Sequence, residues 1–348
     1  MGCKMNYLFF SFLLLLALYF IGTYFIAKGK EVRHDNRVLS VDVGNICKGF
    51  AIIMVLWSHI GNRFGIRWLT PLGAWGVGIF LFFSGYGLEY STKKNGIRDY
   101  WKKRITTAYV PYITAEIIGF LFCLSAEYQN LSLGKIMMDI FLIDTVHPFG
   151  WYMQCLFIYY GAFFLAKKLF PDSYKACCGF LLIVSFIIFI CFRELFKQQL
   201  FSFTLGVLIA NNMTWLQEKT SSVRWPVAFL LAGLVCLMAR QFQCVRELHW
   251  IAYNLIHALQ VAFLVFGTIL MVQCICNICN AVFTDAFLRL GLIAYELYLY
   301  HAFILCYINK FELSYYWITF YFIVSVLTAF IINKYKNAVM KKERSGIN

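Results

Sequence analysis

Long apolar runs separated by short polar connections make up most of the chain. A membrane-spanning helix needs about 20 mostly apolar residues, and shorter runs can cross when flanks and neighbours help. Eleven runs meet this description, near residues 7–27, 46–62, 70–90, 108–125, 151–166, 176–192, 199–211, 225–239, 249–273, 288–308 and 315–332. The stretch 135–143 carries Asp139 and is too short to cross, so we expect a re-entrant or interfacial segment at the outer face. The pattern predicts an all-α fold, a polytopic transmembrane helix bundle of about eleven spans.

The composition supports a membrane protein rather than a water-soluble one. Apolar residues make up 61% of the chain and charged residues 14%, and the mean hydropathy is +0.69. A soluble domain has about 45–50% apolar and about 25% charged residues, so this apolar excess has no room in a water-facing fold. A net charge of +14 on a soluble chain would suggest nucleic acid, but among apolar helices it is expected to mark one face of a membrane. We therefore expect no nucleic-acid partner.

The cysteines do not indicate a disulfide framework or a metal site. Most of the 13 fall inside apolar runs, where a thiol behaves as a small hydrophobe. Cys274, Cys276 and Cys279 cluster at the end of one run, but they lack a second Cys or His pair at zinc-site spacing. No bound metal is expected.

The basic residues predict how the spans are oriented. Only Lys4 precedes the first run, whereas Lys28, Lys30, Arg33 and Arg37 follow it. Cytoplasmic loops are enriched in Lys and Arg, so the downstream end of the first span should face the cytoplasm. With eleven alternating spans, most of the 31 Lys and Arg residues fall on the inner side. We expect a multi-pass protein with its N-terminus outside and its C-terminus inside.

This layout divides the chain into three segments. Residues 1–40 are expected to form an N-terminal membrane anchor helix and a cytoplasmic loop, because no A-x-A cleavage site follows the first run. The apolar core of that run also exceeds the about 7–15 residues of a signal peptide. Residues 41–334 form the membrane domain, and residues 335–348 a basic cytoplasmic tail. We expect the function to lie within the membrane or at its faces.

The segment KGFAIIMVLWSHIGNRF (residues 48–64) holds the most informative polar residues. Lys48 and His59 are eleven positions apart, so on a helix they lie on nearly one face, separated by about 16 Å of rise. Asn62 and Arg63 extend this polar stripe toward the outside. Ionisable side chains inside a membrane mark functional sites by default, although a hydrogen bond between helices is the alternative for each. An imidazole can serve as a general base near neutral pH, and a cation at the inner mouth can hold a phosphate-bearing donor.

Two further stretches add candidates. The Gly- and Phe-rich run with Ser84 and Gly85 should allow close helix approach, and the basic loop after it ends at Arg104. This loop is either plain positive-inside anchoring or a rim that binds phosphate or coenzyme A. GLIAYELYLYHAF (residues 291–303) places Glu296 and His301 in the tenth run. His301 is either a second catalytic or acceptor-binding group or a packed hydrogen-bond donor.

Taken in order, these stretches resemble the acyltransferase-3 family of bacterial membrane acyltransferases, which includes O-antigen and exopolysaccharide O-acetyltransferases. That family carries an Arg, ten intervening residues and a His in its first core span, and Lys48 and His59 match this spacing. IFLFFSGYGL, WKKRITTAYVPYI, GWYMQCLFIYY and YELYLYH match later family motifs in the same order. The resemblance covers roughly residues 44–332, about ten spans, with the first helix as an addition.

The resemblance implies transfer of an acyl group, most often acetyl, from cytosolic acyl-CoA to a hydroxyl of a cell-surface polysaccharide or its lipid-linked precursor. His59 would be the essential base or transient acyl acceptor, with His301 as a helper. Lys48 would bind or orient the donor, and Arg104 would contact its phosphates. Lys48 replaces the family's Arg, which keeps the charge but loses the bidentate fork. The further Arg often found three residues after Arg104 is Thr107 here, so no role is carried over to that position.

Substrates, partners and location follow from the same resemblance. The donor is acyl-CoA, with acetyl-CoA expected, and no metal is required. The acceptor is a glycan or lipid-linked glycan in contact with membrane lipid, and proteins of polysaccharide biosynthesis are expected partners. The location implied is the inner (cytoplasmic) membrane of a bacterium. The candidate substrate-binding residues are Asn62, Arg63 and Glu296.

Two other classes of protein are considered. In a transporter or flippase for a glycan or small solute, the intramembrane His and Glu would relay protons or bind a sugar. Such folds tend to show inverted repeats and Gly- or Pro-broken helices, whereas this chain has five Pro and no detectable repeat. The unrelated membrane-bound O-acyltransferase fold also carries its active His in an apolar helix, but the order of motifs argues against it.

Overall fold

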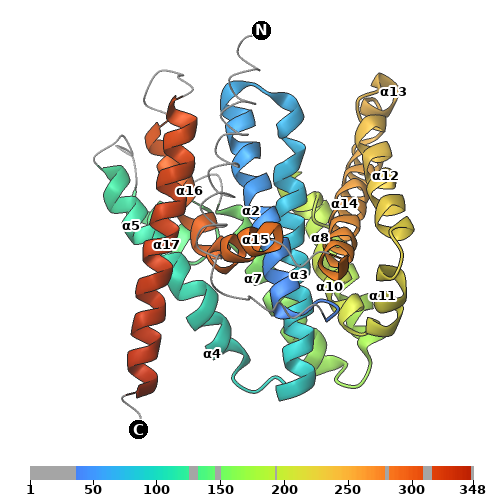
Figure 1. Ribbon diagram of the computed structural model, residues 1–348, viewed down its shortest axis with the longest axis horizontal. Coiled ribbons are helices and arrows are strands. Elements are labelled where there is room, and N and C mark those ends of the chain that lie inside the picture. Colours follow the sequence, from blue (N-terminus) through green and yellow to red (C-terminus); the bar gives the residue numbers. More distant parts are fainter. Residues whose placement is uncertain are drawn as a thin grey trace.

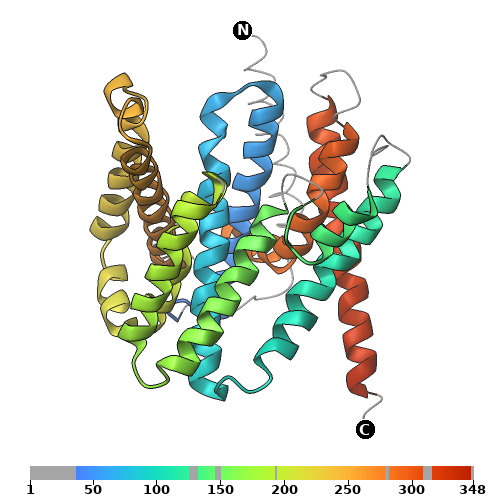
Figure 2. The same ribbon diagram turned by 180° about the vertical axis from the view of Figure 1, so that it is seen from behind.

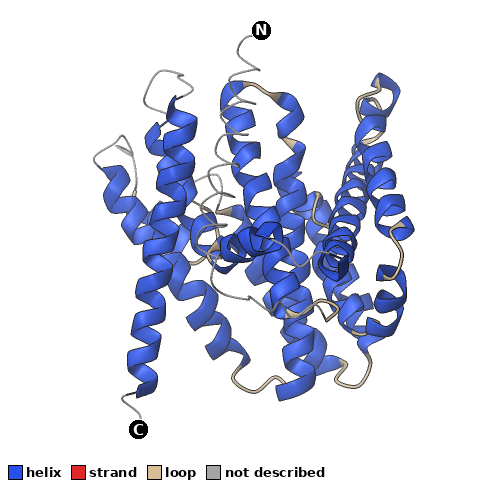
Figure 3. Cartoon of the chain, in the orientation of Figure 1, coloured by secondary structure: helices blue, strands red, loops and turns tan. Residues whose placement is uncertain are grey.

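The computed structural model describes residues 37–124, 132–145, 150–192, 194–278, 282–308 and 316–345. Within these ranges every regular element is helical, as Figure 3 shows, which confirms the predicted all-α class. The first apolar run lies outside the described residues, so the N-terminal anchor helix stays a prediction.

The elements follow the predicted runs closely. They are α2 (Val41–Phe64), η1 (Arg67–Leu69), α3 (Pro71–Asn95), α4 (Tyr100–Arg104), the π-helical turn η2 (Ile105–Tyr109), α5 (Val110–Leu124), α6 (Leu133–Ile140), α7 (Trp151–Leu169), α8 (Tyr174–Cys191), α9 (Glu194–Lys197), α10 (Ser202–Ala210), α11 (Met213–Thr220), α12 (Arg224–Ala239), α13 (Gln243–Arg246), α14 (Trp250–Ile278), α15 (Val282–Leu292), α16 (Ala294–Ile308) and α17 (Tyr316–Ser345).

Five of the described helices are long and apolar enough to cross a membrane, and up to seven spans result if each bent pair counts as one. One bent pair is α11 with α12, at 93°, and the other is α15 with α16, at 70°. These helices confirm a polytopic membrane protein, while the number eleven stays a prediction. The run at 288–308, expected to be a single span, is divided by the bend between α15 and α16.

The antiparallel helices α2 and α3 lie at the centre of the bundle (Figure 1). The C-terminal end of α3, the connection between α7 and α8, and the end of α17 all lie at the same end of the molecule in Figures 1 and 2. Each of these three places carries lysines, including Lys93, Lys167 and Lys341. One end of the bundle is therefore strongly basic.

Glycines allow two pairs of helices to cross with their backbones in contact. A Cβ on Gly49 or Gly291 would clash with the backbone of the other helix of the α2–α15 crossing. Gly85 and Gly206 have the same relationship at the crossing of α3 and α10. The close approach predicted at Gly85 is thus confirmed, because small residues let membrane helices pack backbone to backbone.

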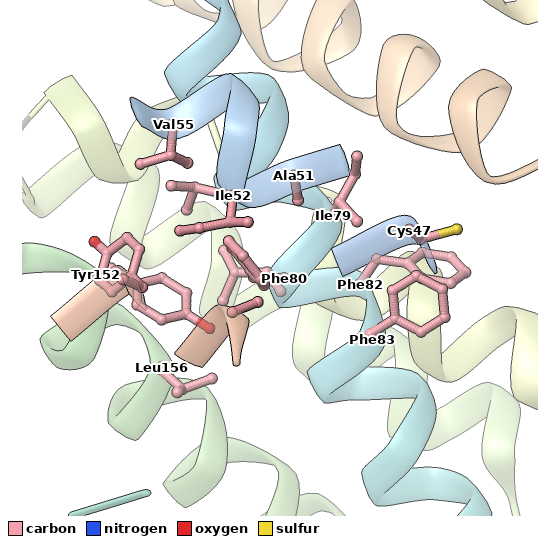
Figure 4. Close-up of a cluster of buried hydrophobic side chains, with 14 of the residues drawn as sticks. Cys47, Ala51, Ile52, Val55, Ile79, Phe80, Phe82, Phe83, Tyr152 and Leu156 are labelled. Carbon is pink, nitrogen blue, oxygen red and sulfur yellow. The ribbon is translucent and has the colours of Figure 1, made fainter. Parts of the chain in front are cut away.

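Apolar side chains of three helices fill the space beside these crossings. Figure 4 shows Ile52 of α2, Phe80 of α3 and Tyr152 of α7 turned toward one another. All three are buried, at 9% exposure or less. This packing fixes α7 against the α2–α3 pair and so determines where the residues on these helices lie.

A buried ion pair joins α3 to α7 near the basic end. Lys167 Nζ lies 2.7 Å from Glu89 Oε2, and the two side chains are 9% and 1% exposed. Asn211 Nδ2 donates a second hydrogen bond to Glu89 Oε1 at 3.1 Å. Because a lone buried carboxylate is strongly unfavourable, these contacts hold three helices together.

The short stretch predicted not to cross the membrane forms α6. Its Asp139 is buried and accepts a hydrogen bond of 2.8 Å from the Tyr112 hydroxyl of α5. Tyr109 at the end of η2 donates to the backbone oxygen of Ile140 at 2.7 Å. These bonds anchor α6 to the segment that runs from α4 through η2 to α5.

Candidate functional site

Two histidines from distant parts of the chain meet inside the bundle. The ring centroids of His59 on α2 and His301 on α16 are 5.2 Å apart, with 23° between the ring planes. His301 is fully buried, and its Nδ1 lies 3.1 Å from the backbone oxygen of Leu297. A carbonyl oxygen only accepts, so this bond assigns the proton to Nδ1 and the lone pair to Nε2 of His301.

Lys48 lies on the same helix as His59, toward the opposite end of α2. The helix is unbroken from Val41 to Phe64, which confirms the helical geometry on which the predicted polar stripe depends. Lys48 Nζ lies 3.5 Å from Asn45 Oδ1 and 5.9 Å from the centroid of the Phe83 ring. The lysine is therefore held near the start of α2.

Lys48 lines a cavity between α2, α3, η2, α7, α15, α16 and α17. Its volume is ≈ 320 Å³, which is at the lower end of the about 300–1,000 Å³ typical of small-molecule sites. Its polar lining includes Asn45, Lys48, Ser84, Glu296, Asn333 and Lys336. The cavity combines amide, hydroxyl and charged groups with aromatic walls.

Three aromatic side chains of this lining pack against one another, and we call them the aromatic wall: Phe80, Tyr152 and Tyr298. Their ring centroids are 4.8 to 6.3 Å apart. The Tyr298 ring is in turn 5.5 Å from the ring of His301. Tyr298 thus links the wall to the His59–His301 pair, and neither histidine is among the lining residues of this cavity.

Glu296 reaches the cavity because of the bend between α15 and α16. Since α15 packs across α2 through Gly49 and Gly291, the chain turns by 70° before α16 begins at Ala294. Glu296, in the first turn of α16, is 3% exposed and accepts a hydrogen bond of 2.8 Å from Lys336 Nζ. The carboxylate therefore faces the cavity in an ion pair with α17.

A protein-family model described as an acyltransferase domain matches residues 45–334 of the chain. The chain belongs to the acyltransferase-3 family. No curated protein and no solved structure matches it significantly. The family match includes both histidines and every residue that lines the cavity except Lys336, which lies two residues beyond its end. The protein is accordingly a membrane acyltransferase.

Arg104 lies beside the cavity of this acyltransferase rather than in its lining. Its guanidinium carbon is 5.7 Å from the centroid of the Tyr160 ring, and Tyr160 lines the cavity. Arg104 ends α4, where the π-helical turn η2 begins, and Thr107 and Ala108 of that turn also line the cavity. The basic loop that leads to Arg104 therefore reaches the cavity wall.

Asn62 and Arg63 lie at the other end of α2 from Lys48. Asn62 is exposed, and its Oδ1 accepts a hydrogen bond of 3.0 Å from the Thr70 hydroxyl. Neither residue lines the described cavity. The structure thus brings Lys48 and Glu296 together in one cavity and pairs His59 with His301, while Asn62 and Arg63 lie apart from both.

Sequence reasoning did not single out Lys336 and Asn333. Both lie in a basic segment where positive-inside anchoring accounts for every cation. The residue that pointed to them in the sequence was Glu296, because a carboxylate buried in the bundle requires a cationic or hydrogen-bonding partner. Helices joined by a short connection pack antiparallel, so the partner of Glu296 was to be expected on the helix that follows α16, which is α17.

In the described part of the chain, no three His, Cys, Asp or Glu side chains are arranged so that they could hold a metal ion. Cys274 and Cys276 are buried in α14, and Cys279 lies outside the described residues. The groups available for chemistry at the site are thus imidazoles, lysines, hydroxyls and a carboxylate.

Proposed function

We propose that this acyltransferase moves an acyl group, with acetyl expected, from cytosolic acyl-CoA to a hydroxyl of a cell-surface polysaccharide or its lipid-linked precursor. The observation that carries the proposal is the cavity with lysines in its lining and an aromatic wall next to the His59–His301 pair. An anionic donor requires cations at one end of its site and a proton acceptor near its reactive carbon.

The dimensions of α2 suit such a donor. Lys48 and His59 are separated by about 16 Å along the helix axis. In coenzyme A, the pantetheine arm separates the thioester from the phosphates by a similar extended length. With the phosphates at Lys48 and Arg104, the arm would pass through the cavity and bring the acyl carbon past the aromatic wall to His59. Tyr298 and Tyr152 would then border the thioester.

His59 would serve as the general base for the acceptor hydroxyl. Its imidazole takes the hydroxyl proton as the oxygen attacks the thioester carbonyl carbon and forms the new C–O bond. The C–S bond then breaks, and the sulfur of coenzyme A takes up the proton from the imidazolium. His301, whose Nδ1 is tied to the backbone of α16, would keep the ring of His59 in place. A transient acyl group on His59 is the alternative use of the same nitrogen.

The orientation in the membrane is part of the proposal. The basic end of the bundle, with Lys93, Lys167 and Lys341, is expected to face the cytoplasm of a bacterium. The C-terminus would then lie inside and the N-terminus outside. This orientation gives the donor cavity the cytosolic side, where acyl-CoA is made, and leaves Asn62 and Arg63 for an acceptor at the outer side.

One observation favours the transporter alternative, since two helix pairs are sharply bent. Discontinuous helices line substrate sites in many transporters. Here, however, one bend places Glu296 in the cavity of a chain that belongs to an acyltransferase family. We therefore interpret the bend as part of the acyl-transfer site.

Mass spectrometry of cell-surface glycans tests the proposal directly. A strain that lacks the gene should lose an acyl mass from one polymer, and the wild-type gene should restore it. The His59→Ala gene should not restore it, although the protein is expressed and inserted. An unchanged glycan profile on deletion, or full restoration by His59→Ala, would refute the proposed function.

A further inference from the structure

Lys336 lines the cavity from α17, a helix that carries neither of the predicted donor-binding residues, Lys48 and Arg104. It lies about two and a half turns before Ser345, where α17 ends, and its side chain is 33% exposed. Asn333, one turn earlier, lines the same cavity and donates to the backbone oxygen of Leu292 at 3.3 Å. α17 is therefore fastened to the end of α15 at the point where Lys336 faces the cavity.

The hydrogen bonding of Lys336 leaves part of its ammonium group available. A lysine has three N–H donors, and the one hydrogen bond described for Lys336 goes to Glu296 Oε1. The carboxylate is 3% exposed, whereas the lysine is about ten times more accessible. Glu296 thus occupies one of the three N–H donors of Lys336, whose side chain also lines the cavity.

The charges of the lining favour an anionic ligand. Lys48 and Lys336 are cationic and Glu296 is anionic, so the lining has one net positive charge. Ala294 and Tyr295 also line the cavity at the first turn of α16, where backbone N–H groups lack partners within the helix. The C-terminal end of α15, at Gly291 and Leu292, lines the cavity as well, so the two helix dipoles oppose each other and the favourable field comes from the two lysines.

If Lys336 served only as the counter-ion of Glu296, its exposure in the cavity would have no explanation. Lys334, two residues earlier on the same helix, is exposed and does not line the cavity, so the basic character of α17 by itself does not place a cation there. The ion pair with Glu296 also restricts the side chain in advance, which lowers the entropy lost when an anion binds.

From this geometry we infer that Lys336, held by Glu296, forms with Lys48 a phosphate-binding subsite at the mouth of the cavity. The inference rests on the proposed function and names the part of the donor recognised there, a phosphate ester of coenzyme A. Glu296 then acts as a positioning residue for Lys336 rather than as a contact to the acceptor.

The test measures binding by the full-length protein in lipid nanodiscs, by titration with coenzyme A, 4′-phosphopantetheine and pantetheine. Lys336→Ala should weaken coenzyme A and phosphopantetheine binding about tenfold, as expected for loss of a charge-assisted hydrogen bond. Pantetheine, which lacks phosphate, should bind the variant and the wild type equally. Lys336→Arg should retain most of the preference for the phosphorylated ligand, and Lys334→Ala, the matched control, should behave as wild type.

A second variant covers the case in which Lys336→Ala fails to fold because Glu296 is left unpaired. The double variant Lys336→Ala with Glu296→Gln removes both charges, and its preference for phosphopantetheine over pantetheine should also fall about tenfold. Glu296→Gln alone should keep it. A wild-type preference in the double variant, or equal weakening of phosphopantetheine and pantetheine, would overturn the subsite while leaving coenzyme A as the donor. Failure of the wild type to bind coenzyme A would overturn the proposed donor as well.

Discussion

The imidazole rings of His59 and His301 lie 5.2 Å apart, although they belong to the first and the second-last helices that the structure describes. Of the two, His59 is partly accessible, whereas His301 is fully buried and bonded to its own helix. A reacting group must be reachable, so the difference in burial favours the proposal in which His59 transfers the proton and His301 supports it.

Replacement of His59 by Ala should lower acyl transfer by at least about 100-fold, because general-base catalysis contributes about 10²–10⁴-fold. The measurement is the rate of acyl transfer from radiolabelled acetyl-CoA in membranes that contain equal amounts of protein. His249→Ala provides a control, since His249 is an exposed histidine outside the site. Comparable rates for the His59 and His249 variants would exclude His59 as the base.

Replacement of Lys48 by Ala should separate donor binding from chemistry. We expect the KM for acyl-CoA to rise about tenfold, with a smaller change in kcat, because a cation that holds phosphate contributes mainly to binding. His59→Ala should bind coenzyme A as tightly as the wild type, and calorimetry compares the two variants. Equal coenzyme A affinity in both would remove the role assigned to Lys48.

The crossing of α3 and α10 predicts that alanine at two nearby glycine positions affects stability differently. Gly85→Ala places a Cβ against the backbone oxygen of Phe203, so overpacking should reduce stability by about 1–3 kcal/mol. Gly87 has no atom within 4 Å of an added Cβ, and Gly87→Ala should be neutral or slightly stabilising. Thermal unfolding in detergent compares the two Tm values. A Tm for Gly85→Ala at or above that of Gly87→Ala would contradict the close crossing.

The buried pair of Lys167 and Glu89 predicts a large effect on stability. Lys167→Ala leaves the carboxylate unpaired, so the free energy of unfolding should fall by about 3–5 kcal/mol. Lys168→Ala, at the neighbouring exposed position, should change it little. Chemical denaturation followed by tryptophan fluorescence gives both values. A loss for Lys167→Ala no larger than that for Lys168→Ala would show that Glu89 does not depend on this partner.

Much of the helical layout could be predicted because it depends on local hydrophobicity. The run at 46–62 lies within α2, and the run at 225–239 coincides almost fully with α12. The same-face relationship of Lys48 and His59 needed only an unbroken helix. These features are encoded by consecutive residues and so are readable from the sequence.

The remaining features depend on contacts between distant segments. The apolar run at 288–308 has no break in its hydrophobicity, and its bend accompanies the packing of Gly291 against the backbone of Asn45. The ion pair between Glu296 and Lys336 requires knowledge of how α16 and α17 face each other. Spacing along one helix could not reveal either, and for the same reason His301 was found as a candidate without its proximity to His59.

The aromatic wall has a consequence for the membrane itself. A polar recess that reached from one face of a bilayer to the other would let protons and water through and dissipate the gradients on which the cell depends. Phe80, Tyr152 and Tyr298 pack against one another in the lining of the lysine-lined recess, and Tyr298 also lies beside His301, so close packing on this side of the recess would hold back bulk solvent. The same barrier would protect a reactive thioester from hydrolysis before its acceptor arrives.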